Sequence, residues 1–329
     1  MRKKRFWILC SLLLLAALRS RADVALLLEE PYGDFGRFNP TGHAAVYLPR
    51  VCADTPLVLR RCLPGENGVV ISRYYKISGY DWIAMPLTAY LYAVDDPSQI
   101  PDVVDAKRVA ELRDDYRRRY LQTLAPDRPD GDAPGGEWTL LVGEAYDRKI
   151  YGFQIATTEE QDDDLIQMLN QRPNKRRRHD LATFMVSRNC ADFARGILNF
   201  YYPHAVHRNF VADLGITTPK QVAKSLVKYA HRHPDLEVSG FVIPQVPGSI
   251  PRSHGANGVA EALVKSKKYV VPLAVLHPFV AGGAVVVYLG GKGRFNPSHE
   301  VRRFPMSPDI AALWELRQRS TVSSAELDP

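Results

Sequence analysis

The chain has 329 residues, of which 46% are apolar and 24% charged, and its formal net charge at pH 7 is +7. This composition excludes a disordered chain and a fibrous repeat, and the length suffices for one large domain or two smaller ones. Six basic residues and no acidic ones lie before residue 23, and without them the charge is only +1. We therefore expect no nucleic-acid partner, because phosphate binding needs a basic face.

The first residues have the pattern of an export signal. A basic start is followed by an uncharged run over 6–18 and by the small residues Ser20 and Ala22. This pattern predicts a secretory signal peptide over 1–22; an uncleaved anchor is the alternative, although the run is short for a membrane span. We expect an exported protein of the periplasm or cell envelope, anchored to the inner membrane if a second apolar segment spans it.

Cysteine spacing fits export to an oxidising compartment. Cys52 and Cys62 bracket "ADTPLVLRR", a stretch short enough to close a turn or hairpin. We predict that the two form a disulfide, which leaves Cys190 unpaired in the mature chain. An unpaired cysteine in an exported protein is either a reactive thiol or an intermolecular partner.

The expected elements follow in chain order. Strands are expected at 42–48 and 68–77, followed by an amphipathic helix within 102–124 and a Pro- and Gly-rich surface loop at 125–137. Two more strands at 138–146 and 149–156 precede a helix after Thr158, which has Gln161 at capping-box spacing. The last expected elements are a strand at 180–188 and helices at 190–203 and 217–233.

A basic run and a pair of histidines are the remaining candidate binding groups. The basic run at 174–179 is expected to be a solvated loop, with an anionic surface or substrate as the alternative. His231 and His233 are two residues apart and would point to different helix faces, so they complement the helix dipole better than they bind a metal. We expect neither a metal nor a cofactor.

A second uncharged run covers 269–291, and basic residues stand on both sides of it. Its length suits a bilayer, which favours a membrane segment over 265–291. Two buried strands with a turn at "AGG" are the alternative, because Pro272 and Pro278 weaken a helix. The tail 292–329 has no assigned role.

Cys190 and His43 are the candidate catalytic pair. Cys190 opens a predicted helix, whose first N–H groups favour negative charge and can bind an oxyanion. His43 opens a predicted strand after Gly42, where its side chain can face a cleft as a general base. Considered alone, a single strand histidine is more often structural and a single cysteine more often a small core residue.

The segments "GHAAVYL" and, far downstream, "SRNCADFARGIL" resemble the circularly permuted NlpC-like branch of the papain superfamily, which includes the lecithin:retinol acyltransferase-like proteins. The resemblance implies an α+β fold over 23–255, with an antiparallel sheet packed against helices and an insertion at about 80–137. It also implies that Cys190 is the nucleophile and His43 the base. The third catalytic member would lie on the strand 68–77, where Ser72 is our candidate although the family has His, Asn or Gln there. Asn189 is expected to cap the helix.

Three functions remain open from the sequence. The first is a thiol-dependent amidase or peptidase of the cell envelope that acts on cell-wall peptides. The second is a lipid-directed acyl hydrolase or acyltransferase, which an apolar segment would hold near the bilayer. The third is a non-catalytic envelope module that keeps the fold for binding, as the unusual third residue would suggest. The sequence leaves the oligomeric state undetermined.

Overall fold

A computed structural model describes residues 22–33, 40–75, 77–128, 137–174, 188–290 and 295–306. Nearly all of the expected signal peptide, most of the basic run, most of the expected strand at 180–188 and most of the C-terminal tail lie outside these residues. The first element among the described residues is a strand that starts at Ala22.

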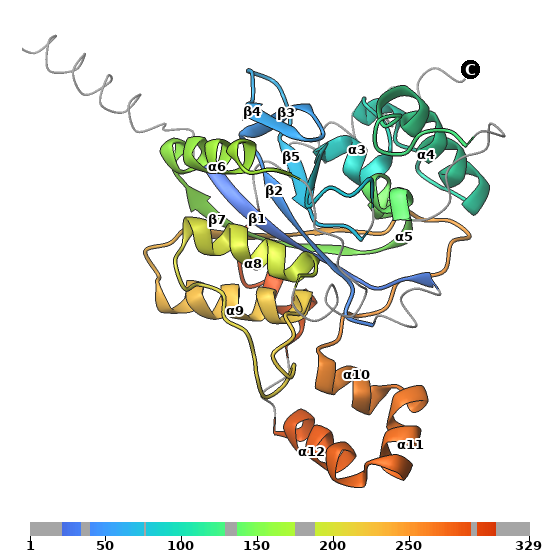
Figure 1. Cartoon of the computed structure of the whole chain (residues 1–329), viewed down its shortest axis with the longest axis vertical. Coiled ribbons are helices and arrows are strands. Elements are labelled where there is room, and N and C mark those ends of the chain that lie inside the picture. The colour runs from blue at the N-terminus through green and yellow to red at the C-terminus, as the bar shows by residue number, and fades with distance from the viewer. Residues whose placement is uncertain are drawn as a thin grey trace, which may run out of the picture.

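The centre of the molecule is a six-stranded antiparallel sheet (Figure 1). Its strands, in spatial order, are β6 (Ile83–Pro86), β5 (Val69–Ser72), β2 (His43–Leu48), β1 (Ala22–Glu29), β7 (Ile150–Thr157) and β8 (Val238–Ile243). A two-stranded hairpin of β3 (Val51–Thr55) and β4 (Val58–Arg61) follows β2. The fold is therefore mixed α and β, with an antiparallel sheet packed against helices.

Helices cover both faces of the sheet. One face packs against α3 (Leu87–Tyr92), α4 (Ala106–Tyr120) and α5 (Glu144–Asp147). The other packs against α6 (Glu159–Gln171), α8 (Cys190–Tyr201) and α9 (Pro219–Arg232). The remaining helices are η1 (Pro97–Gln99), η2 (Glu137–Leu141), α10 (Val259–Lys265), α11 (Lys267–Leu276), α12 (Pro278–Leu289) and α13 (Pro297–Val301).

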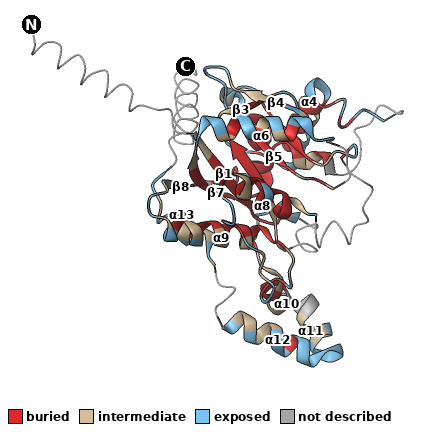
Figure 2. Cartoon of the chain, turned by 60° about the vertical axis from the view of Figure 1, so that its left-hand side comes forward, coloured by how far each residue is buried: buried red, intermediate tan, exposed pale blue. Residues whose placement is uncertain are grey.

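The central strand β1 shows why this arrangement is stable. Val24, Leu26 and Leu28 face the α8 layer, while Ala25 and Leu27 face the α4 layer, and all five are fully buried. Because successive side chains of a strand point to opposite faces, a sheet covered on both sides needs a continuous apolar run. Figure 2 shows this buried band through the middle of the molecule.

Several expected elements are present with their expected ends. The Thr158 and Gln161 capping box opens α6, Thr218 caps α9 with Pro219 in its first turn, and α8 ends before Pro203. These matches follow from local chemistry, since side-chain caps satisfy the free N–H groups of the first turn.

Other expectations were wrong. Residues 138–146, predicted to be a strand, form η2 and α5, because Trp138, Leu141, Val142, Ala145 and Tyr146 are buried at helical spacing. The strand predicted over 68–77 is confined to Val69–Ser72. Three strands of the sheet, β1, β6 and β8, were not predicted; β1 begins at Ala22, the last of the residues that were expected to form a signal peptide.

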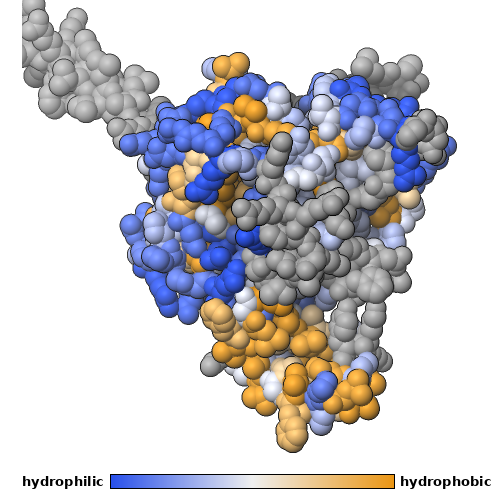
Figure 3. Space-filling model, viewed as in Figure 1, coloured by the Kyte–Doolittle hydropathy of each residue, from blue (hydrophilic) through white to orange (hydrophobic). Residues whose placement is uncertain are grey.

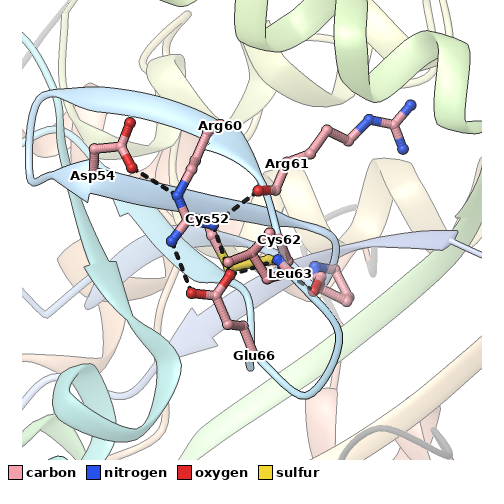
Figure 4. Close-up of a disulfide and its surroundings, with 8 residues drawn as sticks. Cys52, Asp54, Arg60, Arg61, Cys62, Leu63 and Glu66 are labelled. Atoms are coloured by element: carbon pink, nitrogen blue, oxygen red, sulfur yellow. Dashed lines mark hydrogen bonds and ion pairs between the residues drawn. A yellow bond between two sulfur atoms is a disulfide. The ribbon is translucent and has the colours of Figure 1, made fainter.

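The predicted disulfide between Cys52 and Cys62 closes the β3–β4 hairpin (Figure 4). Beside it, the Arg60 guanidinium bonds Asp54 at 2.7 Å and Glu66 at 2.6 and 2.7 Å. The hairpin lies beyond Leu48, at the opposite end of β2 from His43. The disulfide is therefore a structural clamp placed away from the candidate catalytic residues.

The second apolar run forms neither two buried strands nor one continuous helix. It is divided at His277 into α11, which contains Pro272, and α12. Among the described residues, every helix is too short or too polar to cross a bilayer. Figure 1 shows α10, α11 and α12 projecting together from one end of the molecule.

Candidate functional site

Cys190 is the first residue of α8, and Asn189 is the N-cap, as the sequence predicts. The Asn189 side-chain oxygen accepts the Asp192 N–H at 2.8 Å, and its amide nitrogen donates to the Thr217 carbonyl at 2.9 Å. Asp192 in turn bonds Arg208 at 2.7 Å and the Thr217 hydroxyl at 2.6 Å. The start of α8 is thus fastened to the segment that leads into α9.

The Cys190 sulphur lies at the end of the sheet, beside the backbone of β2. Burial raises the pKa of the thiol to about 11, although the backbone N–H groups of Ala44 and Ala191 favour the thiolate. The side chain is only half-buried, so the site keeps some contact with the surface. The rise in the thiol pKa caused by burial therefore exceeds the lowering caused by the helix N-terminus, and the resting thiol is protonated.

His43 is held by Ser72, the candidate third residue. The Ser72 oxygen lies 3.0 Å from His43 Nε2, and its hydroxyl donates to the Ala44 carbonyl at 2.8 Å. Because the one hydroxyl proton is used on Ala44, Ser72 can only accept from His43, which places the imidazole proton on Nε2. This leaves Nδ1 as the basic nitrogen.

The imidazole is neutral in its surroundings. Its ring stacks on Tyr74 with 5.4 Å between ring centroids. Burial, followed by the charge of Arg148, lowers the pKa of His43 to about 3. Between about pH 3 and about pH 11 the pair therefore rests as imidazole and thiol rather than as an ion pair.

Of the sequence-predicted residues, His43 and Ser72 meet on one face of the sheet, whereas Cys190, within the described part of the chain, packs with the α8 layer on the other face and makes no hydrogen bond with His43. Ala44 packs in the α8 layer, whereas Ala45 and Tyr47 pack in the layer of Tyr74. The alternation of β2 therefore turns His43 toward the Tyr74 side, and both side chains, which lie within the described residues, make no mutual hydrogen bond. The sulphur instead adjoins the peptide that links His43 to Ala44.

A buried acidic cluster behind His43 was not predicted. Glu29, the last residue of β1, is paired with His43 in the sheet register and is completely buried. It accepts a hydrogen bond from the Tyr90 hydroxyl and lies 3.2 Å from Arg148, which also contacts Glu144 at 2.8 Å. Glu29, Glu144 and Arg148 thus share one buried compartment with Tyr90.

Two carboxylates with one guanidinium leave a surplus negative charge in this compartment. Burial raises the pKa of Glu144 to about 8, against the opposing charge of Arg148, and the neighbouring Glu29 raises it further. Burial also raises the pKa of Glu29. At neutral pH the cluster consequently holds a proton, which removes the repulsion between the two carboxyls and balances the single cation.

Weak signals for this cluster exist in the sequence. Glu29 interrupts the apolar run of β1 at its end, while Glu144 and Arg148 enclose Ala145, Tyr146 and Asp147. Only the pairing of β1 with β2, and of α5 with the same sheet face, shows that these charges meet.

One group of side chains has the composition of a metal site. Ligand atoms of Cys52, Cys62 and Glu66 lie within 4.8 Å of one another. The two sulphurs are bonded to each other, and Glu66 is bonded to Arg60, so the group does not offer the thiolate ligands that a transition metal needs.

Comparisons of this chain with protein-family models, with curated proteins and with solved structures found no significant match.

Proposed function

We propose that the chain is an exported, thiol-dependent acyl-transfer hydrolase of the amidase or peptidase type, with the permuted papain-like fold of the NlpC-like superfamily. Cys190 is the nucleophile, His43 the general base and Ser72 the residue that orients the base. The observation that carries the proposal is the Ser72–His43 bond, which leaves Nδ1 basic, together with a thiol at the start of a capped helix beside the Ala44 backbone.

The neutral resting pair determines how the reaction would proceed. The sulphur attacks the substrate carbonyl carbon as His43 Nδ1 takes the thiol proton, and nearby backbone N–H groups stabilise the oxyanion. The proton then passes to the leaving group, and water hydrolyses the thioester to restore the thiol. Since no bond joins the two side chains at rest, the imidazole has to turn toward the sulphur as substrate binds.

Two alternatives each have one observation in their favour. The exposed apolar helices α11 and α12 favour a lipid-directed acyl hydrolase or acyltransferase, because α10 joins them to the segments that hold the start of α8. The low pKa of His43 and the high pKa of Cys190 favour a non-catalytic binding module.

Product analysis distinguishes these functions. The full chain is incubated with isolated cell walls and, separately, with phospholipid vesicles, and the products are identified by mass spectrometry. We expect released peptides from the cell walls, and a loss of about 1,000-fold or more in Cys190→Ala and His43→Gln, because nucleophile and base act as one unit. Fatty-acid release alone would favour the lipid-directed enzyme.

Thiol labelling separates an enzyme from a binding module. We expect the Cys190 iodoacetamide rate to rise toward about pH 11 in wild type and its pH profile to shift in His43→Gln. A profile unchanged in His43→Gln, together with no product from either substrate, would establish the module.

For Ser72, imidazole nitrogen NMR should show the Nε2–H tautomer in wild type and a mixture in Ser72→Ala, with lower activity.

A further inference from the structure

Exposed apolar side chains gather at one end of the molecule (Figure 3). We call them the apolar tip, and they lie on α11, α12 and the loop between α8 and α9: Phe210, Val211, Leu214, Val271, Val275, Leu276, Phe279, Val280, Val286 and Leu289. Phe279 is 94% exposed. A contiguous apolar surface of this kind marks an interaction site.

The two helices of the tip lack the polar face of an ordinary surface helix. Between Val270 and Leu289 the only side chains with polar atoms are those of His277 and Tyr288. A helix that is apolar all round is normally buried, whereas here both helices keep outward faces in solvent. Their environment in the working protein must therefore be apolar.

Helix length limits what that environment can be. α11 has 10 residues and α12 has 12. At 1.5 Å per residue they are about 15 and 18 Å long. The hydrocarbon core of a bilayer is about 30 Å thick, so each helix matches about one leaflet.

A basic cavity adjoins the tip. It has a volume of about 780 Å³, and Phe210 and Val211 of the tip form part of its wall. Its lining includes three histidines and no carboxylate, and its cationic residues are Arg208, Lys224, Lys228 and Arg232. Arg208 is paired with Asp192, and Lys224 interacts with Asp213, so the test of the cavity's charge uses Lys228 and Arg232.

The basic wall is continuous with α12. Lys224 also lines a smaller cavity together with Val287 and Tyr288, and the wall of that cavity contains Lys220, Asp213 and Glu261 as well. The apolar tip and the basic cavity next to it match the two layers of a lipid leaflet. The tip would contact the hydrocarbon, and the cavity would lie at the level of the phosphates.

We propose that the apolar tip inserts into one leaflet of a membrane with anionic phospholipids, and that the basic cavity binds their headgroup phosphates. α10 connects this surface to the candidate site through the Lys220–Glu261 ion pair at 2.6 Å and the Val259 N–H bond to Asp213 at 2.8 Å. Insertion of the tip turns the Cys190 end of the molecule toward the membrane. Docking does not require the proposed chemistry.

Vesicle flotation tests this docking. The full chain is mixed with vesicles of phosphatidylcholine alone or with about one third phosphatidylglycerol. We expect binding that needs the anionic lipid and falls more than tenfold in Leu276→Asn/Phe279→Asn. The matched control is Leu63→Asn/Val103→Asn, which changes two exposed apolar residues away from the tip and should bind as wild type does. Circular dichroism verifies that each variant is folded.

The charge of the cavity has its own test. Lys228→Gln/Arg232→Gln should lose about 25-fold on anionic vesicles, roughly fivefold for each cation, and little on phosphatidylcholine. Cys190→Ala should bind as wild type does, so a failed catalytic proposal leaves docking intact. Equal vesicle binding by wild type and by the tip variant would overturn the proposal, because residues outside the tip, such as residues 1–21, would then account for the binding. The proposal would also be overturned if wild type did not bind vesicles but formed a dimer that the tip variant could not form.

Discussion

Asn189 holds the first turn of α8 in place with both ends of its amide. Its oxygen caps the helix through Asp192, and its nitrogen reaches the Thr217 carbonyl across the segment before α9. Since Cys190 follows directly, the position of the sulphur depends on these two bonds. Local chemistry at one residue thereby connects helix geometry to the candidate site.

Replacing Asn189 should weaken the fold measurably. We expect Asn189→Ala to lower the free energy of unfolding by about 1–2 kcal/mol, because a capping bond is lost. Asn189→Asp keeps the accepting oxygen and should lose less. Urea unfolding measures both, with exposed Asn67→Ala as the control. A loss in Asn67→Ala as large as in Asn189→Ala would contradict this role.

At the scale of elements, two glycines have opposite surroundings. A Cβ at Gly152 in β7 would lie 2.1 Å from the buried Phe241 ring of β8, so only glycine lets the ring pack directly on the β7 backbone. A Cβ at Gly196 in α8 would meet nothing within 4 Å. The sheet interior is closely packed at this point, whereas that face of the helix is open.

The two glycines make a matched pair of substitutions. Gly152→Ala should lower the free energy of unfolding by about 1–3 kcal/mol, because the Phe241 ring must move in a filled core. Gly196→Ala should raise it by up to about 1 kcal/mol, since alanine is the better helix residue. Thermal or urea unfolding of both variants gives the sign, and destabilisation by Gly196→Ala would refute the open surroundings.

At the scale of the whole molecule, buried titratable groups make stability depend on pH. Glu144 has a pKa of about 8 in the folded chain and about 4.5 when unfolded. Between these values the folded chain binds more protons, so stability falls as pH rises. His43 has a pKa of about 3 when folded and 6.5 when unfolded, so there the unfolded chain binds more protons and stability falls as pH drops.

Together the two groups predict greatest stability between about pH 4.5 and 6.5, where their effects oppose each other. Glu144→Gln should remove much of the decrease between about pH 6.5 and 8, on the order of 1–2 kcal/mol. His43→Gln should reduce the decrease below pH 4.5. Urea unfolding at pH 4, 5.5 and 8 measures these slopes, with exposed Glu160→Gln as control. An unchanged alkaline slope in Glu144→Gln would show that Glu144 titrates normally.

Much of the secondary structure could be predicted where the signal was local. The capping box of α6, the Thr218 and Pro219 start of α9 and the short Cys52–Cys62 loop each depend on residues close in sequence. The wrong prediction at 138–146 has a local cause too, because the buried residues there follow a helical period and not the alternation of a strand.

The sequence by itself determined the capped starts of α6, α8 and α9 and the disulfide hairpin, because caps and short cysteine spacings act over a few residues. Only the tertiary structure decided that Ser72 bonds His43, that Glu29 and Glu144 share a buried compartment, and that α11 and α12 keep apolar faces exposed. These features depend on the register of β1 with β2 and on which layer covers each sheet face. Both are set by contacts between residues far apart in the chain.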